Sequence, residues 1–432
     1  MAIAKTNPGP KNLPSAKSAP KAAKKAVVAE AKAPTAAKPV AAKAKAPTAA
    51  KAVAAKAKAP TVAKPVAAKA KAPTATKAVA AKAKAPTATK AVAAEAKAPT
   101  VAKVAIAKRA PGWSGENLPS YDQLPVRAGA PAGSAWGVFG DQDEVGTVNL
   151  LTPARVRAAK DCIKSGKVFA LNLPIDVPNP PLFTRQAHRH TVKTFDGELE
   201  FVLDDYLDNF YPQASSQWDA LCHVMHPELG AYNGIPKNEI TGRGGKRLGI
   251  DNWARRGIAG RGVLADIARY YDSVGKKIDY TKAESIPLED LEATLARQKS
   301  PLREGDILLI RIGWTKFYYG ASDSLKEELA RETVVPGIEG TDRVAKWLWN
   351  HHLAAVASDS PALEALPKPE GSTEFLHFHM LAFFGMPIGE MWNLEELAAD
   401  CANDKQYEFF LTSAPLNVPG GVGSPPNALA IK

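Results

Sequence analysis

The sequence has few cysteines and no long apolar stretch. Its three cysteines, Cys162, Cys222 and Cys401, are far apart and odd in number, so they suggest neither a disulfide framework nor a Cys-x-x-Cys metal motif. No uncharged apolar run reaches the ~18–20 residues of a membrane span. The first residues also lack the apolar centre of a secretory signal. We therefore expect a protein of a reducing compartment, in the cytoplasm, with no membrane partner.

Acidic and aromatic residues are nearly absent from the first 110 residues. Of the 56 Lys/Arg and 44 Asp/Glu of the chain, 24 bases but only two acids, Glu30 and Glu95, lie there, which gives this segment a net charge of +22. The other 322 residues hold 32 bases and 42 acids, a net charge of −10, and all eight Trp and eight His. Only they can build a packed core. We expect a disordered basic tail at 1–110 and one folded domain at 111–432.

The tail is a Lys/Ala/Pro-rich repeat. The dipeptide Pro-Thr recurs with a period of 13 residues, at Pro34, Pro47, Pro60, Pro73, Pro86 and Pro99. A proline in each unit interrupts any helix, and alanine and valine offer little surface to bury. The composition is similar to that of linker-histone tails and fits nonspecific binding of nucleic acid or another polyanion. A solubilising spacer is the alternative, and the aromatic residues typical of single-strand binding are absent.

Strand-like and helix-like segments alternate in the second part of the chain. Short segments rich in β-branched residues and bounded by Gly, Pro or Asp predict strands at 168–171, 199–203, 262–265, 307–312 and 353–357. Helical patterns lie at 153–165, 287–298, 341–351 and 394–402. The order predicts an α/β fold with a mixed sheet, because several strands follow one another without a helix between them.

A first group of candidate metal ligands lies in the segment 215–224. Gln217, Asp219 and His223 are spaced by two and four residues, so all three can face one cavity if an extended segment turns there into a loop or helix. Carboxylate, imidazole and amide oxygen together suit Zn²⁺ or Mn²⁺. An ordinary hydrogen-bonded Asp–His pair explains the same spacing.

A second group lies in the segment 376–390. His377 and His379 share a face if this segment is extended, and Glu390 follows a Gly/Pro turn. Two histidines and a carboxylate are plausible ligands. The alternative is one core histidine together with an acid stabilised by the N-terminus of the helix that follows.

At these residues the chain resembles a known family. Asp219 and His223 occupy the last two positions of the pattern H-x-G-T-H-x-D-x-x-x-H, which marks the cyclase family that includes kynurenine formamidase and isatin hydrolase. The resemblance covers essentially 111–432 through collinear blocks: 136–140 (WGVFG), 146–153 (GTVNLLTP), 216–219 (SQWD), 232–234 (YNG), 260–264 (GRGVL), 305–308 (GDIL), 387–390 (PIGE) and 415–425 (PLNVPGGVGSP).

The resemblance implies a swivelling β/β/α fold, a homo-oligomer, and hydrolysis of a small amide or lactam, as in arylformamidases, by metal-activated water. The ligands that it implies in this chain are Asp219, His223, His377 and Glu390. Gln213 and Gln217 stand where the motif has its first two histidines, and the carbonyl oxygen of Gln217 can still ligate a metal. We therefore expect one divalent ion, Mn²⁺ or Zn²⁺, at most two, and no organic cofactor.

The remaining candidates concern catalysis and substrate binding. His223 or His379 is the candidate general base and acid, although His223 cannot be a tight ligand and a free base at once. Trp218 and Phe384 are candidates for the wall of a substrate pocket, with core packing as the alternative. Arg261 is a candidate clamp for a substrate carboxylate, with a structural ion pair as the alternative.

Two functions remain open at this stage. The retained ligands favour a metal-dependent amidohydrolase or cyclase, for which formamidase activity on kynurenine precursors, a step of tryptophan catabolism, is the nearest named activity. The two glutamines favour an altered scaffold that binds a small molecule or a polyanion without catalysis. The substrate itself cannot be read from the residues.

Overall fold

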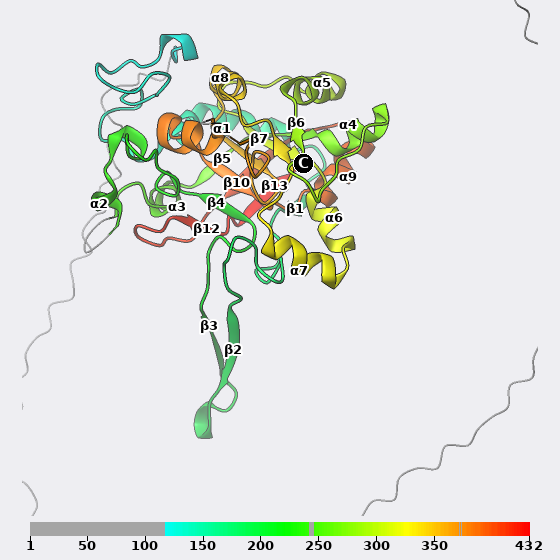
Figure 1. Cartoon of the computed structure of the whole chain (residues 1–432). Coiled ribbons are helices and arrows are strands. Elements are labelled where there is room, and N and C mark those ends of the chain that lie inside the picture. Colours follow the sequence, from blue (N-terminus) through cyan, green and yellow to red (C-terminus); the bar gives the residue numbers. More distant parts are fainter. Residues whose placement is uncertain (1–116, 242–245, 371, 373) are drawn as a thin grey trace, which may run out of the picture. The chain divides into compact units, whose positions relative to one another are not determined.

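The computed structural model describes residues 117–241, 246–370, 372 and 374–432, so the predicted tail at 1–110 lies outside the described residues. In the described part, nine strands form one curled mixed sheet with helices packed around it (Figure 1). This sheet confirms the predicted α/β class. From edge to edge its strands are β1 (Val168–Ala170), β13 (Ala428–Ile431), β11 (Glu408–Ser413), β5 (Ile258–Asp266), β7 (Ile307–Arg311), β9 (Ala355–Ser358), β10 (Ile388–Glu390), β4 (Gln217–Asp219) and β12 (Gly423–Ser424).

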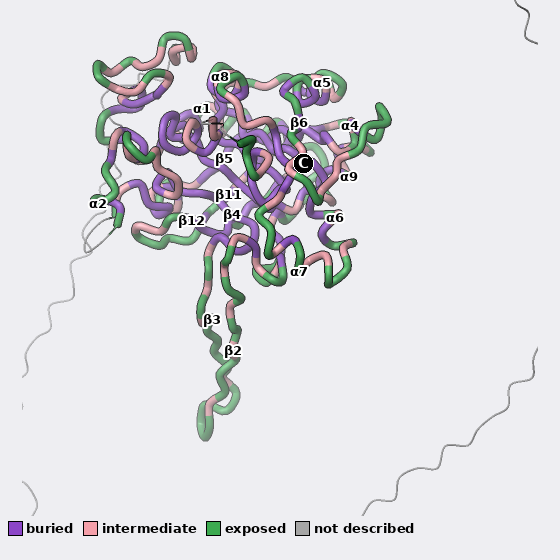
Figure 2. The backbone as a smooth tube through the Cα atoms, viewed as in Figure 1, coloured by how far each residue is buried: buried purple, intermediate pink, exposed green. Residues whose placement is uncertain are grey.

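The centre of the sheet is parallel and fully buried. Strands β5, β7, β9 and β10 run parallel, and every residue of β7 and β9 is buried. Figure 2 shows this buried centre. Because such strands are covered on both faces, they read as continuous apolar runs. That is why β5, β7 and β9 overlap three strands predicted from the sequence, whereas β1, which also overlaps a predicted strand, is a largely exposed edge strand.

Helices connect and cover the strands. The predicted helices 287–298, 341–351 and 394–402 correspond to α5 (Leu288–Gln298), α8 (Asp342–Asn350) and α9 (Glu395–Asp404). The helix predicted at 153–165 ends early, at Ala159, and continues as a 3₁₀ turn at Lys160–Cys162. The α-helices are α1 (Pro153–Ala159), α2 (Lys237–Ile240), α3 (Asp251–Arg256), α4 (Ile267–Val274), α5 (Leu288–Gln298), α6 (Trp314–Gly320), α7 (Asp323–Arg331), α8 (Asp342–Asn350) and α9 (Glu395–Asp404). Among the described residues, no helix has the length and apolarity needed to cross a membrane.

Two strand pairs lie outside the main sheet. Strands β6 (Ser285–Ile286) and β8 (Gly337–Ile338) form a short parallel pair. Strands β2 (Arg189–Thr194) and β3 (Leu203–Asp208) form a hairpin that extends away from the sheet and is exposed along most of its length (Figures 1 and 2). The strand predicted at 199–203 is wrong: its residues form the tip of this hairpin, where Phe201 is 81% exposed. The segment had been predicted as a strand because it is a short stretch of strand-favouring residues bounded by Gly and Asp.

A close backbone contact joins the segment before α1 to the segment before β10. Gly146 has φ +66°, and a Cβ at this position would lie 1.8 Å from the carbonyl oxygen of Gly385. The same oxygen accepts a hydrogen bond from the backbone N–H of Thr147. Only glycine fits such an approach at positive φ. The contact holds the polypeptide that leads into β10, and therefore Glu390, against the body of the domain.

The buried carboxylate of Asp143 supports this contact. It accepts hydrogen bonds from the backbone N–H of Gly146 (2.7 Å), from Nδ2 of Asn149 (2.7 Å) and from the hydroxyl of Tyr232 (3.2 Å). Burial raises the pKa of Asp143 from 3.8 to about 6, although these hydrogen bonds oppose the increase.

Stability is expected to depend on pH through Asp143. Between about pH 4 and 6 the folded protein retains a proton that the unfolded chain releases, so this group's contribution falls as pH rises through that interval. Asp143→Asn removes the effect. From pH 4 to 7, the free energy of unfolding of wild type should fall relative to that of the variant by on the order of 3 kcal/mol. Urea unfolding of both proteins between pH 4 and 7 measures this difference. If the free energies of unfolding of the two proteins changed in parallel with pH, the prediction would be contradicted.

Candidate metal centre

Two neighbouring strands place three polar side chains on one face of the sheet. Strand β4 pairs antiparallel with β10, with Gln217 opposite Glu390 and Asp219 opposite Ile388. Alternate residues of a strand point to the same face, so Gln217 and Asp219 lie together while Trp218 points to the other side. Gln217, Asp219 and Glu390 are buried. The pairing thus brings together residues that are 173 positions apart in the chain.

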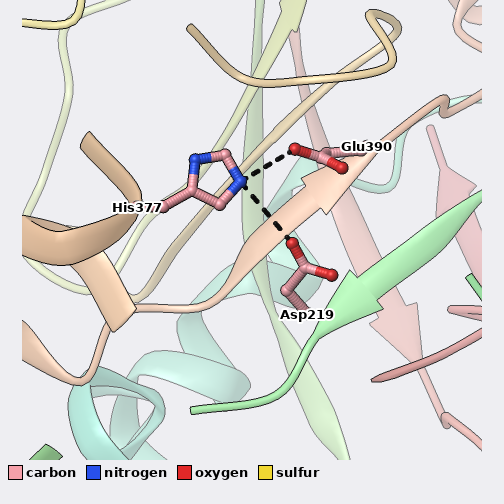
Figure 3. A group of neighbouring side chains, drawn as sticks. All are labelled: Asp219, His377 and Glu390. Atoms are coloured by element: carbon pink, nitrogen blue, oxygen red, sulfur yellow. Dashed lines mark hydrogen bonds and ion pairs between the residues drawn. The ribbon is translucent and has the colours of Figure 1, made fainter. Parts of the chain in front are cut away.

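His377 completes the cluster from a third segment. It directly precedes the π-helix η6 (Phe378–Phe384), a rare helix type that is frequent at functional sites. Its Nε2 lies 3.2 Å from Oε1 of Glu390 and 3.8 Å from Oδ2 of Asp219 (Figure 3). Candidate ligand atoms of the three residues all lie within 4.8 Å of one another. One ion can therefore contact all three side chains.

A buried carboxylate behind His377 fixes the orientation of its ring. Oε2 of Glu364 accepts a hydrogen bond from Nδ1 of His377 (2.8 Å), and Oε1 accepts one from the backbone N–H of the same residue (3.2 Å). With the proton of the neutral ring on Nδ1, the Nε2 lone pair points into the cluster. Histidine ligands of metals are typically held by such a carboxylate partner.

Two buried oxygens of the cluster have no hydrogen-bond donor. They are Oδ2 of Asp219 and Oε1 of Gln217, whose amide N–H is used instead as a donor to Oε2 of Glu390 (2.5 Å). An unsatisfied acceptor in the interior is unfavourable. A divalent cation would satisfy both oxygens, and the set of carboxylate, amide and imidazole donors suits Zn²⁺ or Mn²⁺. The residues therefore fit a metal ion.

Gln213 and His223 lie beside Asp219 at the edge of the cluster. Nε2 of Gln213 donates to Oδ1 of Asp219 (2.6 Å) and lies 3.2 Å from Nδ1 of His223. Nε2 of His223 is 3.7 Å from Oδ1 of Asp219, and its side chain is 28% exposed. Gly423 gives room for this amide, since a Cβ there would lie 2.5 Å from Cδ of Gln213. His223 is thus the cluster histidine with access to solvent.

The charges of the cluster shift one another's pKa. Burial, reinforced by the charge of Asp219, raises the pKa of Glu390. Burial alone would lower the pKa of His377, but the charge and hydrogen bond of Glu364, together with Glu390, raise it well above its usual value. Burial opposes ionisation of Glu364, yet the charge of His377 lowers the pKa of that carboxyl. A cation held by His377 would require the neutral form of its ring, so binding would be linked to pH.

The structure places the other candidate residues away from the three clustered side chains. The segment 376–384 is helical and not extended, and Nε2 of His379 pairs with Asp342 of α8 (2.9 Å). Trp218 is buried against Trp392, and Phe384 against Trp349. The guanidinium of Arg261 pairs with Asp306 and with Glu408.

Two residues near the cluster had no signal in the sequence. Glu364 is a lone acid in a stretch without a motif, and only its contact with His377 shows its place. Arg185 precedes the hairpin, and no candidate role in the sequence analysis fell on it. The charges of Glu390 and Asp219 act on its guanidinium. Glu364 contacts the cluster through the fold and not through sequence spacing.

Fold and cluster together define an α/β protein with a candidate metal centre on its mixed sheet. The sequence profile of the putative cyclase family matches residues 165–365. A solved structure described as a novel cyclase is 39% identical, and the alignment covers 69% of this chain and 99% of that one with a TM-score of 0.62. The chain belongs to the cyclase family.

More distant solved structures are also similar. Isatin hydrolase A from Ralstonia solanacearum is 17% identical, with 65% of this chain and 97% of that chain covered and a TM-score of 0.45. A predicted metal-dependent hydrolase from Bacillus stearothermophilus is 17% identical, with 61% and 97% covered and a TM-score of 0.35. No curated protein matches the chain.

Proposed function

We propose that this chain is a metal-dependent hydrolase that cleaves a C–N amide or lactam bond of a small molecule with water. The observation that carries the proposal is the buried cluster of Asp219, His377 and Glu390, with an unsatisfied oxygen on Asp219 that faces Nε2 of His377. Membership of the cyclase family supports it.

Each residue of the cluster has a distinct part in this proposal. Asp219, His377 and Glu390 would hold one Mn²⁺ or Zn²⁺, and Gln217 would add its carbonyl oxygen. Such an ion supplies Lewis-acid chemistry, since it lowers the pKa of water and polarises a carbonyl oxygen. Glu364 keeps the Nε2 lone pair of His377 directed at the site.

His223 is the residue that we propose to transfer protons. It lies at the exposed side of the cluster and contacts Gln213 through Nδ1, so its Nε2 can take a proton from water and return it to the leaving nitrogen. His379 was the other candidate. Its Nε2 is paired with Asp342, and burial lowers its pKa. The geometry therefore favours His223 over His379.

Metal content and turnover test the proposal directly. Full-length protein purified without affinity histidines should contain about one Mn or Zn per chain by elemental mass spectrometry. After reloading with that ion, it should hydrolyse members of a panel of amides and lactams. A folded protein that stays empty after incubation with Mn²⁺, Zn²⁺ and Fe²⁺ would rule the proposal out.

Loss of the carboxylate behind His377 should weaken metal binding. Glu364→Gln removes the charge that orients the ring, so we expect a 10- to 100-fold loss of metal affinity, the range typical of such partners. Competition with a chelator measures it. Glu374→Gln is the matched control, because Glu374 lies on the same segment but accepts its hydrogen bond from Asp342. Equal affinities of the Glu364 variant and wild type would refute this role.

One observation favours the alternative of a binding protein without catalysis. The side-chain N–H group of Gln213 donates a hydrogen bond to Asp219, and that of Gln217 donates one to Glu390. These bonds partly satisfy the carboxylate oxygens that a metal ion would otherwise satisfy. If the metal test fails, a scaffold that binds a small molecule becomes the better account.

Three further predictions concern the whole chain. Nonspecific binding of polyanions by residues 1–110 is tested by the salt dependence of binding to duplex DNA, with a protein that begins at residue 111 as the comparison.

A homo-oligomer is tested by sedimentation of the full-length protein. A cytoplasmic location is tested by fractionation of cells.

A further inference from the structure

The hairpin of β2 and β3 ends in exposed apolar side chains. The two strands pair only with each other and extend away from the main sheet (Figure 1). A two-stranded hairpin without further packing is marginally stable in water. Near its end Leu199 and Leu203 are exposed, and Phe201 is 81% exposed. Large apolar side chains gathered in this way are typical of an interaction surface.

The end of the hairpin is also acidic. We call residues 196–204 the hairpin tip. It carries four exposed acids, none of which forms an ion pair within the described part of the chain: Asp196, Glu198, Glu200 and Asp204. Further along β3, by contrast, Asp208 pairs with Arg189 (2.7 Å). The hairpin tip therefore combines an apolar centre with unpaired negative charge, and its charge favours a partner surface that carries bases.

A second exposed apolar surface lies beside β12. Residues 414–427 contain no charged residue, and Leu416, Val418 and Val422 in this segment are exposed. The segment is fixed next to β4, because the carbonyl of Val422 accepts a hydrogen bond from the backbone N–H of Ala220 (3.1 Å). An uncharged segment held in place at the surface offers an apolar site to a partner.

Bases border this apolar segment. Residues 246–256 are joined to it by a hydrogen bond from the backbone N–H of Ile250 to the carbonyl of Gly421 (2.8 Å). They hold one acid, Asp251, and four bases: Lys246, Arg247, Arg255 and Arg256. Arg247 pairs with Glu144 and Arg255 with Asp251, whereas Lys246 and Arg256 form no ion pair with the described residues. We call 414–427 together with 246–256 the receiving surface.

We propose that the hairpin tip of one copy docks on the receiving surface of a second copy, in a twofold dimer where each chain gives one hairpin and receives one. The two surfaces match in apolar character and are opposite in charge. Both stay exposed in the single chain, so neither covers the other. Because an isologous dimer uses each surface twice, a second copy satisfies both. The inference identifies the contact of the expected homo-oligomer and does not depend on the metal centre.

Cysteine trapping tests the contact directly. Full-length Phe201→Cys and Val418→Cys chains are coexpressed and oxidised, and intact mass distinguishes a mixed disulfide dimer from pairs of identical chains. We expect the mixed dimer to be the main cross-linked product. Val422→Cys serves as a second receiving position. Val168→Cys is the matched control, because Val168 is also exposed but lies on β1, at the opposite edge of the sheet from β12.

Sedimentation measures the strength of the same contact. Phe201→Ser should weaken dimerisation at least about 30-fold, as expected when an aromatic anchor at the centre of an interface is lost. Its circular dichroism should match that of wild type, because the side chain is exposed in the single chain. Tyr319→Ser is the control, since Tyr319 is an exposed aromatic residue of α6 outside both surfaces.

Four results would overturn the inference. The first is a wild-type protein that sediments as a monomer. The second is a Phe201→Ser dimer as tight as that of wild type. The third is a yield of mixed dimer, with both receiving positions, that does not exceed the Val168→Cys control. The fourth is cross-linking of Phe201→Cys chains only to each other, which would mean that the tips meet. Metal content and hydrolysis are measured separately, so failure of the proposed function would leave this test intact.

Discussion

Asp219→Ala is expected to leave the protein folded but without metal. Asp219 is the fully buried carboxylate whose Oδ2 has no donor, and it faces Nε2 of His377. Its loss should weaken metal binding by more than about 100-fold, beyond the range for outer partners of a ligand, and hydrolysis should be lost with the ion. Elemental mass spectrometry of wild type and variant, purified side by side, measures the first effect.

The fold should survive this substitution. Asp219 and Glu390 are like charges in a buried site, so removal of one relieves repulsion in the protein without metal. Asp219→Asn, of nearly the same shape, provides a second variant if the alanine protein fails to fold. Asp290→Asn is the control, because Asp290 is also buried but pairs with Lys276 and Tyr271. Wild-type metal content in Asp219→Ala would refute the assignment.

His223→Gln is expected to lower kcat by 10²- to 10⁴-fold, the usual contribution of a positioned acid or base. Metal content and KM should change little, because His223 lies outside the group of three close ligand atoms. Single-turnover kinetics on an amide found by the substrate panel, with the metal measured on the same sample, separates chemistry from binding.

The matched variant is His379→Gln. His379 is close in sequence to the cluster but pairs with Asp342, so its loss should change kcat only a few-fold. If His379→Gln proved the slower enzyme, the proton transfer would belong to that residue. If instead His223→Gln lost its metal, His223 would be a ligand, the role that the family resemblance implied.

Much of the fold followed from local patterns. The predicted strand at 307–312 was correct because a strand that is buried on both faces must be apolar throughout. The strand predicted at 199–203 was wrong because its apolar residues lie exposed at the tip of a hairpin. The pattern of apolar residues shows which side chains a segment is able to bury. Whether those side chains are buried depends on the segments that pack against it.

The candidate site was predicted only in part, because the sequence shows residue types but not which segments pack together. Asp219, His377 and Glu390 stood out by residue type, and the structure brings them together. The expected shared face of His377 and His379 depended on an extended segment. The helix there separates the two histidines, so that one faces the cluster and the other faces α8.

The sequence by itself determined a strongly basic segment ahead of an acidic one, an α/β class, and the residue types able to bind a metal. These properties reside in composition and in short-range order. Tertiary structure decided which groups meet: it paired Gln217 with Glu390 across 173 residues and set Glu364 behind His377. Such contacts depend on strand register and on chain segments that are distant in sequence, and no local pattern records them.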